Sequence, residues 1–348
     1  MRRCGEFCTT YKADTTIFPT PMSRAFAVGS VLLLVVAPAV LNAYFLNLLI
    51  QIGYYGIAAL GLNIVVGFTG QISLGHAAFF GFGAFASAWL NNRFGIPVFF
   101  SIPLAGVLTL AVGLVVGIPA GRIKGLYLAI ATLASQYILE DFFARADWFT
   151  GGSYGAMAAP FTIFGYTLNT DRSYFYVVLF YLVAMYLLGS NLLRTRDGRA
   201  FVAVRDHYLS AEIMGINLTK YRILSFGVSS FYAGIGGALF GHYLGFVSAE
   251  GFTILLSIQF LAMVIIGGLG SVMGSLMGTA FMVLLPEVME GMVHAVGNGS
   301  PGFTQALAYL KEMSIGLAII LFLIFEPDGL AHRWRMIKTY WKLYPFSY

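Results

Sequence analysis

Ionisable side chains are scarce in this sequence. Asp, Glu, Lys and Arg make up 10% of its 348 residues, whereas 59% are hydrophobic. A soluble globular domain carries roughly 25% charged residues, so this chain has too few to cover a surface in contact with water. Most of the chain is therefore expected to lie in lipid, where helices and closed barrels are the only spanning structures that satisfy the backbone.

Cysteine and nucleotide-binding motifs are also scarce, which excludes several classes of function. The two cysteines, Cys4 and Cys8, have no cysteine or histidine cluster beside them, so we expect neither a disulfide nor a metal site. The pattern Gly-x-x-x-x-Gly-Lys-[Ser/Thr] is absent, and with it a P-loop nucleotide-hydrolysing module. No nucleophile–base pair and no basic run interleaved with aromatic residues is evident. We predict no catalytic residue, no metal, no cofactor bound by this chain and no nucleic-acid partner.

The chain is instead built from long apolar runs. Residues 25–92 contain no Asp, Glu, Lys or Arg, a length that suits three membrane crossings of about 20 residues each. Ten apolar stretches can be separated, at residues 25–41, 45–66, 70–90, 97–119, 125–144, 173–192, 223–246, 254–269, 271–292 and 305–325. They predict an all-α integral membrane protein, a polytopic bundle of about ten transmembrane or re-entrant helices. A few glycines alone divide the eighth stretch from the ninth, so either can be short, broken or re-entrant.

Positive charges predict how the chain is oriented. With ten crossings and a cytoplasmic N-terminus, 16 of the 20 Lys and Arg residues face the cytoplasm, as the positive-inside rule expects. The opposite orientation inverts this ratio, and an odd number of crossings places one charged end on the wrong side. We predict a cytoplasmic N-terminal tail (1–24), a transmembrane domain (25–327) and a cytoplasmic C-terminal tail (328–348). Within the domain, residues 145–172 form an outer loop and residues 193–222 a cytoplasmic loop.

Two glycine-rich segments interrupt the apolar runs about 200 residues apart. Their principal glycines are Gly67, Gly70 and Gly75 in the first segment and Gly267, Gly268 and Gly270 in the second. In lipid, small residues let helix backbones approach closely, and paired interruptions in two halves are typical of transporters with discontinuous helices. The pattern therefore predicts helix breaks and a weak internal repeat. Ordinary helix packing explains the same glycines equally well.

Four polar side chains lie in or beside the first glycine-rich segment, namely Asn63, Gln71, Ser73 and His76. Polar groups within hydrocarbon require partners or a water-lined path, so we predict that these four line a translocation path. The alternative is that they only join neighbouring helices. No acidic residue lies convincingly in the middle of a span, which argues against a proton-coupled carrier.

The charged loop has a structure of its own. Asp197-Gly198 is a turn signal, and short helices are predicted at residues 200–204 and 210–214. Ser210 is a suitable N-cap for the second helix, and Gly215 can end it in the left-handed conformation. A short rigid helix on the membrane face suits a soluble partner, whereas a solvated loop that only retains positive charge is the alternative.

Several of these segments, taken in order, resemble the permease subunits of branched-chain amino-acid ABC importers, of the LivM type. The resemblance rests on residues 59–63, 75–84, 198–200, 203–206, 211–217, 221–238 and 265–274. It covers about residues 45–327 and is specific because separate motifs occur in the right order. His207 and Tyr208 depart from it, because smaller or amide residues are expected there.

The resemblance implies a permease that works with a second, similar permease, two cytoplasmic ATPase subunits that bind ATP and Mg, and a periplasmic substrate-binding protein. It implies that the loop docks on an ATPase, with Arg205, Asp206, Glu212 and Gly215 at the coupling contact. The chain is then a multi-pass protein of the cell inner membrane that moves branched-chain amino acids by alternating access. Urea and short-chain amide importers share these motifs, so the substrate stays open. A stand-alone channel or secondary carrier is a further alternative.

Overall fold

The computed structural model describes residues 10, 16–17, 21–123, 125–163, 166–168, 170–296 and 301–343. Each of the ten apolar stretches corresponds to a helix, which confirms the prediction of an all-α polytopic membrane protein. These helices are α2 (Pro21–Val40), α3 (Ala43–Asn63), α4 (His76–Phe94), α5 (Val98–Ala120), α6 (Leu126–Arg145), α8 (Asp171–Leu192), α11 (Leu218–Leu244), α12 (Ile254–Gly267), α13 (Val272–Val296) and α14 (Pro301–Phe325). Cys4, Cys8 and Lys124 lie outside the described residues.

Length and composition divide these helices into two groups. Among the described residues, seven helical segments are long and apolar enough to cross a membrane. An eighth arises if α14 and the following helix α15 (Gly329–Leu343) form a single span bent by 49°. Helices α4 and α6 are not in this set, yet α4 packs closely against α11, α5 and α6. The bundle itself therefore accommodates helices that lack the composition of an isolated span.

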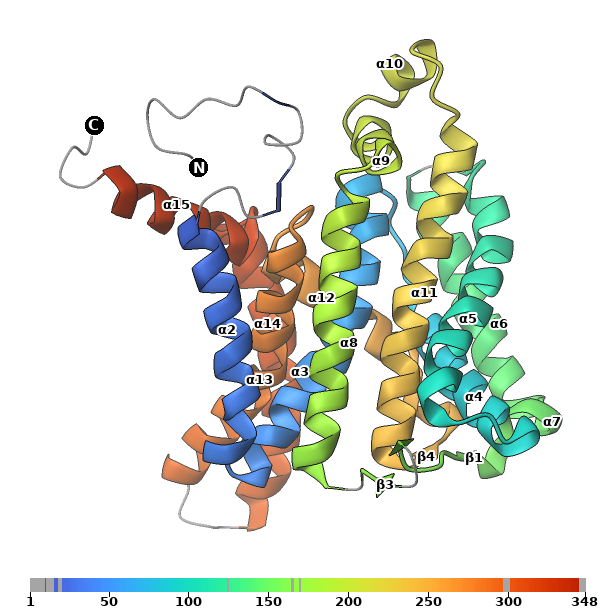
Figure 1. Ribbon diagram of the computed structural model, residues 1–348, viewed down its shortest axis with the longest axis vertical. Coiled ribbons are helices and arrows are strands. Elements are labelled where there is room, and N and C mark those ends of the chain that lie inside the picture. Colours follow the sequence, from blue (N-terminus) through green and yellow to red (C-terminus); the bar gives the residue numbers. More distant parts are fainter. Residues whose placement is uncertain are drawn as a thin grey trace.

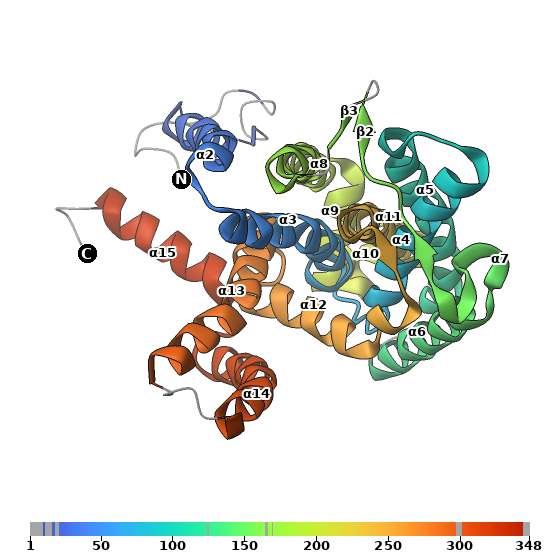
Figure 2. The same ribbon diagram turned by 90° about the horizontal axis from the view of Figure 1, so that it is seen from below.

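Large apolar side chains cover the outside of the bundle. Examples are Phe26 and Leu33 on α2, Val115 on α5, Ile138 on α6 and Leu321 on α14, all of them exposed. Helices α2 and α14 lie at the periphery, where α2 packs on α8, and α14 on α12 and α13 (Figure 2). An apolar surface of this extent is expected where the solvent is lipid.

Helix α11 lies at the centre, packed against α3, α4 and α5 (Figure 2). Small residues make this close packing possible. A Cβ atom on Gly237 would overlap the carbonyl oxygen of Phe80, and one on Gly83 would overlap the backbone of Gly234. The backbones of α4 and α11 thus touch, as helices rich in small residues do in lipid.

The connections gather at two opposite ends of the bundle (Figure 1). Helices α9 (Arg196–Asp206) and α10 (Tyr208–Ile213) lie at the end that also carries α15. The other end carries α7 (Asp147–Thr150), the 3-10 turns η2 (Gly152–Tyr154) and η3 (Ala249–Gly251), and two antiparallel strand pairs, β1 (Ala156–Met157) with β4 (Phe246–Val247) and β2 (Thr162–Ile163) with β3 (Tyr166–Thr167). The two long loops of the sequence therefore lie at opposite ends.

Some helix limits differ from the sequence prediction for identifiable reasons. Helix α11 begins at Leu218, five residues early, because the Asn217 side chain caps it by accepting a hydrogen bond from the Lys220 amide at 3.0 Å. Helix α4 begins only at His76, because Gly70 has a φ of 67° and residues 70–75 are not helical. The last turn of α3 widens into a π-helix, η1 (Ile64–Phe68).

Candidate functional site

The two glycine-rich segments lie against each other although they are 200 residues apart in sequence. The buried side chain of Asn63, at the end of α3, joins them. Its Nδ2 donates to the carbonyl oxygen of Ser271 at 2.8 Å and to Oγ of Ser275 at 2.7 Å. Its Oδ1 accepts from the amide of Gly270 at 2.9 Å. One amide side chain thus satisfies polar groups at the break between α12 and α13.

Both segments are breaks between helices, and each depends on glycine. Gly70 follows the π-helix with a φ of 67°, and Gly268 and Gly270 separate α12 from α13 with φ values of 112° and 74°. A Cβ on Gly67 would overlap Asn63 and the amide nitrogen of Gly270, and one on Gly267 would overlap Gly274. π-Helical turns occur frequently at functional sites in helices. The paired breaks make this region of the described bundle interior irregular.

Arg205 reaches this region from α9. Its Nη1 donates to the carbonyl oxygen of Gly67 at 2.8 Å, and its Nε donates to the carboxylate of Asp206 at 2.8 Å. A Cβ on Gly270 would lie 2.9 Å from the same Nη1, and one on Gly70 would lie 2.9 Å from Cγ of Arg205. The charged loop and both helix breaks therefore meet at one side chain, which the sequence placed only in the loop.

Gln71 and Ser73 lie between the first break and α4, and both are buried. Nε2 of Gln71 donates to Oγ of Ser225 on α11 at 2.8 Å and to Oγ1 of Thr69 at 3.1 Å. Among the described residues, Oε1 of Gln71 has no hydrogen-bond partner. A buried amide oxygen without a partner is costly, so Gln71 has hydrogen-bonding capacity that the described contacts leave unused.

Side chains from two other helices accept hydrogen bonds from the backbone amides at and just before the start of α4. Thr132 and Gln136 on α6 accept from the amides of Leu74 at 3.0 Å and Ala78 at 2.8 Å. Ser257 on α12 accepts from the amide of Ala77 at 2.9 Å. The first amides of a helix lack partners within the helix, and here side chains provide them. No sequence pattern indicates these contacts, because Thr132 and Gln136 lie in an apolar stretch far from residue 76.

His76 is the first residue of α4 and is buried. Its Nε2 donates to the carbonyl oxygen of Ala58 on α3 at 2.8 Å, and its ring packs edge-on against Phe260. A nitrogen that donates to a carbonyl carries a proton and offers no lone pair to a metal. Within the described part of the chain, no group of three or more His, Cys, Asp or Glu side chains is placed to hold a metal ion.

The charged loop consists largely of helix. Thr195 caps α9 by accepting from the amide of Gly198 at 3.3 Å, so Asp197-Gly198 lies in the first helical turn rather than in a separate turn. The prediction that Ser210 caps the second helix is wrong. Helix α10 begins at Tyr208 with His207 as its N-cap residue, because the chain turns directly out of α9 there. Gly215 follows α10 with a φ of 85°.

The tip of the loop exposes apolar side chains. Ile213 and Met214 are 87% and 84% exposed, and Leu209 and Glu212 are also exposed. Exposed large apolar residues at a tip that projects beyond the bundle are typical of a protein interaction surface (Figure 1). The buried side of the loop is held by Phe201 and Val204 of α9.

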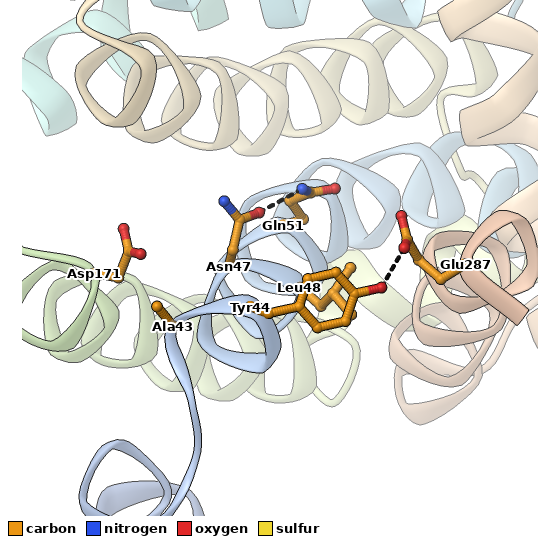
Figure 3. A pocket seen from close by; sticks show the side chains of 7 residues that line it. All are labelled: Ala43, Tyr44, Asn47, Leu48, Gln51, Asp171 and Glu287. Carbon is orange, nitrogen blue, oxygen red and sulfur yellow. Dashed lines mark hydrogen bonds between the residues drawn. The ribbon is translucent and has the colours of Figure 1, made fainter. Parts of the chain in front are cut away.

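A hollow of about 400 Å³ lies toward the opposite end of the bundle, between the start of α3, the start of α8 and the C-terminal half of α13 (Figure 3). It is lined by Ala43, Tyr44, Asn47, Leu48, Gln51, Asp171 and Glu287. The hydroxyl of Tyr44 donates to Glu287, and Nε2 of Gln51 donates to Oδ1 of Asn47 at 2.6 Å. None of the residues of the two helix breaks lines this hollow, and none of the four predicted path residues does.

The family model and the individual relatives that match this chain agree on one protein family. Residues 44–325 match the family model of the permease component of branched-chain amino acid transport systems. The chain is 31% identical over 300 residues to the LivM permease protein of the high-affinity branched-chain amino acid transport system of Salmonella typhimurium, covering 79% of this chain and 67% of that one.

Two further relatives extend the comparison. Identity to the LivM protein of Escherichia coli is 29% over 335 residues, covering 89% of this chain and 75% of that one. Identity to the probable LivH branched-chain amino acid transport permease of Methanocaldococcus jannaschii is 28% over 299 residues, covering 80% and 89%. No solved structure matches the chain.

Proposed function

The chain belongs to the family of branched-chain amino acid transport permeases, and we propose that it is the membrane-spanning subunit of an ATP-driven importer for branched-chain amino acids. In this proposal, two separate cytoplasmic ATPase subunits bind ATP and Mg and hydrolyse the nucleotide. A second, LivH-like permease completes the membrane part, and a periplasmic protein delivers the substrate. The protein lies in the cell inner membrane with both termini in the cytoplasm.

The observation that carries the proposal is the hydrogen bond from Arg205 to the carbonyl oxygen of Gly67. It connects a loop with an exposed apolar tip to the place where two helices of the bundle are broken. A partner that grips α10 and moves α9 therefore acts directly on the breaks. Helix shifts of a few ångströms at such contacts are a common way to convert one packed arrangement into another.

Alternating access requires that the ATPase subunits contact the two arrangements of the permease differently, because only differential binding shifts an equilibrium. We assign the described arrangement to a state in which the two helix breaks are in contact with each other. Asn63 is fully engaged with the second break, and His76 is bonded to α3. Separation of the breaks frees the side chain of Asn63 for a zwitterionic substrate. In this proposal Gln71, Ser73 and His76 line the same path, and a substrate reaches Gln71 and His76 only when their bonds to α11 and α3 also give way.

The test is uptake of radiolabelled leucine by proteoliposomes that contain this chain, its partner permease, the two ATPase subunits and the binding protein. We expect uptake to require ATP. Glu212→Ala, which changes the exposed face of α10, and Gly215→Val, which forces a branched side chain into a φ of 85°, should abolish uptake without loss of protein from the membrane. Glu250→Ala, an exposed acidic residue at the other end, is the control.

Three results would contradict the proposal. Normal uptake by both loop variants removes the coupling role of α10. Uptake by the chain alone, driven by an ion gradient, identifies a secondary carrier instead. Binding of urea rather than leucine, isoleucine or valine by the periplasmic partner changes the substrate while leaving the ATP-driven mechanism in place.

A further inference from the structure

The C-terminal helix α15 has two different long faces. Positions three and four residues apart fall on one side of a helix, and here two such stripes run side by side. The stripes consist of Trp334, Ile337 and Trp341, and of Arg335 and Lys338. One stripe is apolar and aromatic and the other is basic, so α15 is amphipathic in the manner of helices that lie in a membrane interface.

Within the part of the chain that the structure describes, the apolar stripe is largely exposed. Trp334, Ile337 and Trp341 are 54%, 58% and 82% exposed. The first turn, by contrast, is fixed. Ala331 is buried and Gly329 packs closely on Gly268, at the second helix break. Beyond this anchor, α15 extends sideways out of the bundle, as both views show (Figures 1 and 2).

The two acidic residues just before α15 lie beside its first turn and not beside its basic stripe. Arg333 pairs with Glu326, and His332 lies 3.9 Å from the carboxylate of Asp328. Arg335 and Lys338 are exposed. Among the described residues, Nε of Arg335 makes a long hydrogen bond to the carbonyl oxygen of Ala331, at 3.4 Å. The acidic residues nearest in sequence are thus directed to the first turn and not to the basic stripe.

We propose that α15 is an interfacial anchor that binds anionic phospholipid. The aromatic stripe enters the boundary between headgroups and acyl chains, where tryptophan is favoured. The basic stripe contacts lipid phosphates, and each Lys or Arg near an anionic surface strengthens binding by about fivefold. The helix leaves the bundle sideways, bent by 49° from α14, at the end that the positive charges assign to the cytoplasm. In this proposal its axis lies along the membrane surface. The proposal concerns the lipid partner and does not depend on the substrate.

A soluble partner is the competing occupant, and the two stripes argue against it. An ATPase docking on α15 would bury tryptophans at a distance from the exposed tip of α10, on the far side of the same end of the bundle (Figure 1). An anionic membrane surface satisfies both stripes at once. It is also already next to the helix, because α14 leads directly into α15 through residues 326–328.

Hydrogen exchange on the full chain in nanodiscs tests this directly. Amides of residues 334–343 should exchange more slowly in discs containing phosphatidylglycerol than in discs of phosphatidylcholine alone. The double variant Arg335→Gln/Lys338→Gln should weaken the lipid-dependent protection by roughly 25-fold, the product of two fivefold contributions. The control Arg93→Gln/Arg145→Gln removes two exposed charges at the other end and should leave the protection of α15 unchanged.

Tryptophan quenching provides a second measurement that needs no charge change. Lipids brominated near the headgroup should quench the wild-type chain more than Trp334→Phe/Trp341→Phe, in which Trp89 and Trp148 remain. Exchange that is insensitive to lipid charge overturns the proposal. So does quenching by bromines near the bilayer centre, which makes α15 part of a bent span, or protection that arises only when ATPase subunits are added.

Discussion

Arg205 lies where the charged loop and both helix breaks meet, so its side chain tests whether they act together. We expect Arg205→Ala to lower leucine uptake several-fold while ATP hydrolysis by the assembled complex continues. The reason is that the partner still grips α10, but the motion no longer reaches the carbonyl of Gly67. Loss of the bond to Gly67 from a charged donor should cost roughly 1.5–3 kcal/mol in unfolding free energy, and loss of the exposed pair with Asp206 adds little, so we expect the protein to stay folded.

The control for Arg205 is Arg196→Ala, an exposed arginine in the first turn of the same helix. Uptake and ATP hydrolysis measured in parallel separate uncoupling from misfolding. If Arg205→Ala transports at the normal rate, the contact with Gly67 plays no part in coupling.

Asn63 is the residue whose loss should cost the most stability. Asn63→Ala leaves the amide of Gly270, the carbonyl of Ser271 and the hydroxyl of Ser275 without their shared partner. Ser271 and Ser275 keep bonds to each other, but the amide of Gly270 is left unpaired. A buried group left unpaired costs about 1–3 kcal/mol in unfolding free energy, so we expect a loss of about 2 kcal/mol. Denaturation in detergent, followed by circular dichroism, measures it.

Asn92→Ala is the matched control for Asn63. Asn92 is exposed at the end of α4, and its side chain makes a bond to the carbonyl oxygen of Met157 at 2.7 Å. Its removal should change the unfolding free energy by well under half the loss expected for Asn63. Equal losses for the two variants would mean that the bonds across the breaks add little stability.

At the scale of helices, the central packing of α11 depends on residues without side chains. Gly237→Leu places a side chain where the carbonyl of Phe80 lies, and α4 and α11 cannot move apart without disturbing α3 and α5. We expect this variant to be largely unfolded or absent from the membrane. Gly29→Leu on α2, where nothing lies within 4 Å of the added Cβ, should accumulate normally. Comparison of both by membrane fractionation and size-exclusion profile decides the matter.

The helices were predictable because each apolar stretch is long and bounded by charges, glycine or polar loops. Stretch 97–119, for example, agrees with α5 within one residue at either end. Features that depend on distant partners were not. No residue near position 76 indicates that Thr132, Gln136 and Ser257 accept hydrogen bonds from the amides at the start of α4. The π-helix and the short strand pairs likewise arise from packing rather than from local propensity.

The polar residues of the first glycine-rich segment were found for a general reason, that polar groups in lipid need partners. The sequence could not identify those partners. Asn63 is bonded to residues more than 200 positions away, and Gln71 to Ser225. The correspondence between the glycines at 67–70 and 267–270 hinted at a repeat, but it gave no sign that the two breaks touch. Only the fold brings Arg205 to them.

At the scale of the whole molecule, the distribution of charge predicts which end faces the cytoplasm. The end with α9 and α10 holds many of the basic residues, whereas the end with α7 and the strands holds few. Ile213 at the tip of α10 is 87% exposed, and Tyr154 in η2 is 91% exposed at the opposite end. These two positions report the two sides of the membrane with little risk to the fold.

We expect Ile213→Cys, in a background with Cys4 and Cys8 replaced by Ser, to react with a membrane-impermeant maleimide only in inside-out vesicles. Tyr154→Cys should react only in right-side-out vesicles. The physical basis is that basic residues are retained on the cytoplasmic side during insertion, so reversal would need most of the positive charge to cross the membrane. Labelling of both positions from the same side contradicts the bundle as described, because α11 separates them along its full length. Labelling of each from the opposite side instead reverses the orientation and places α10 beyond the reach of a cytoplasmic ATPase.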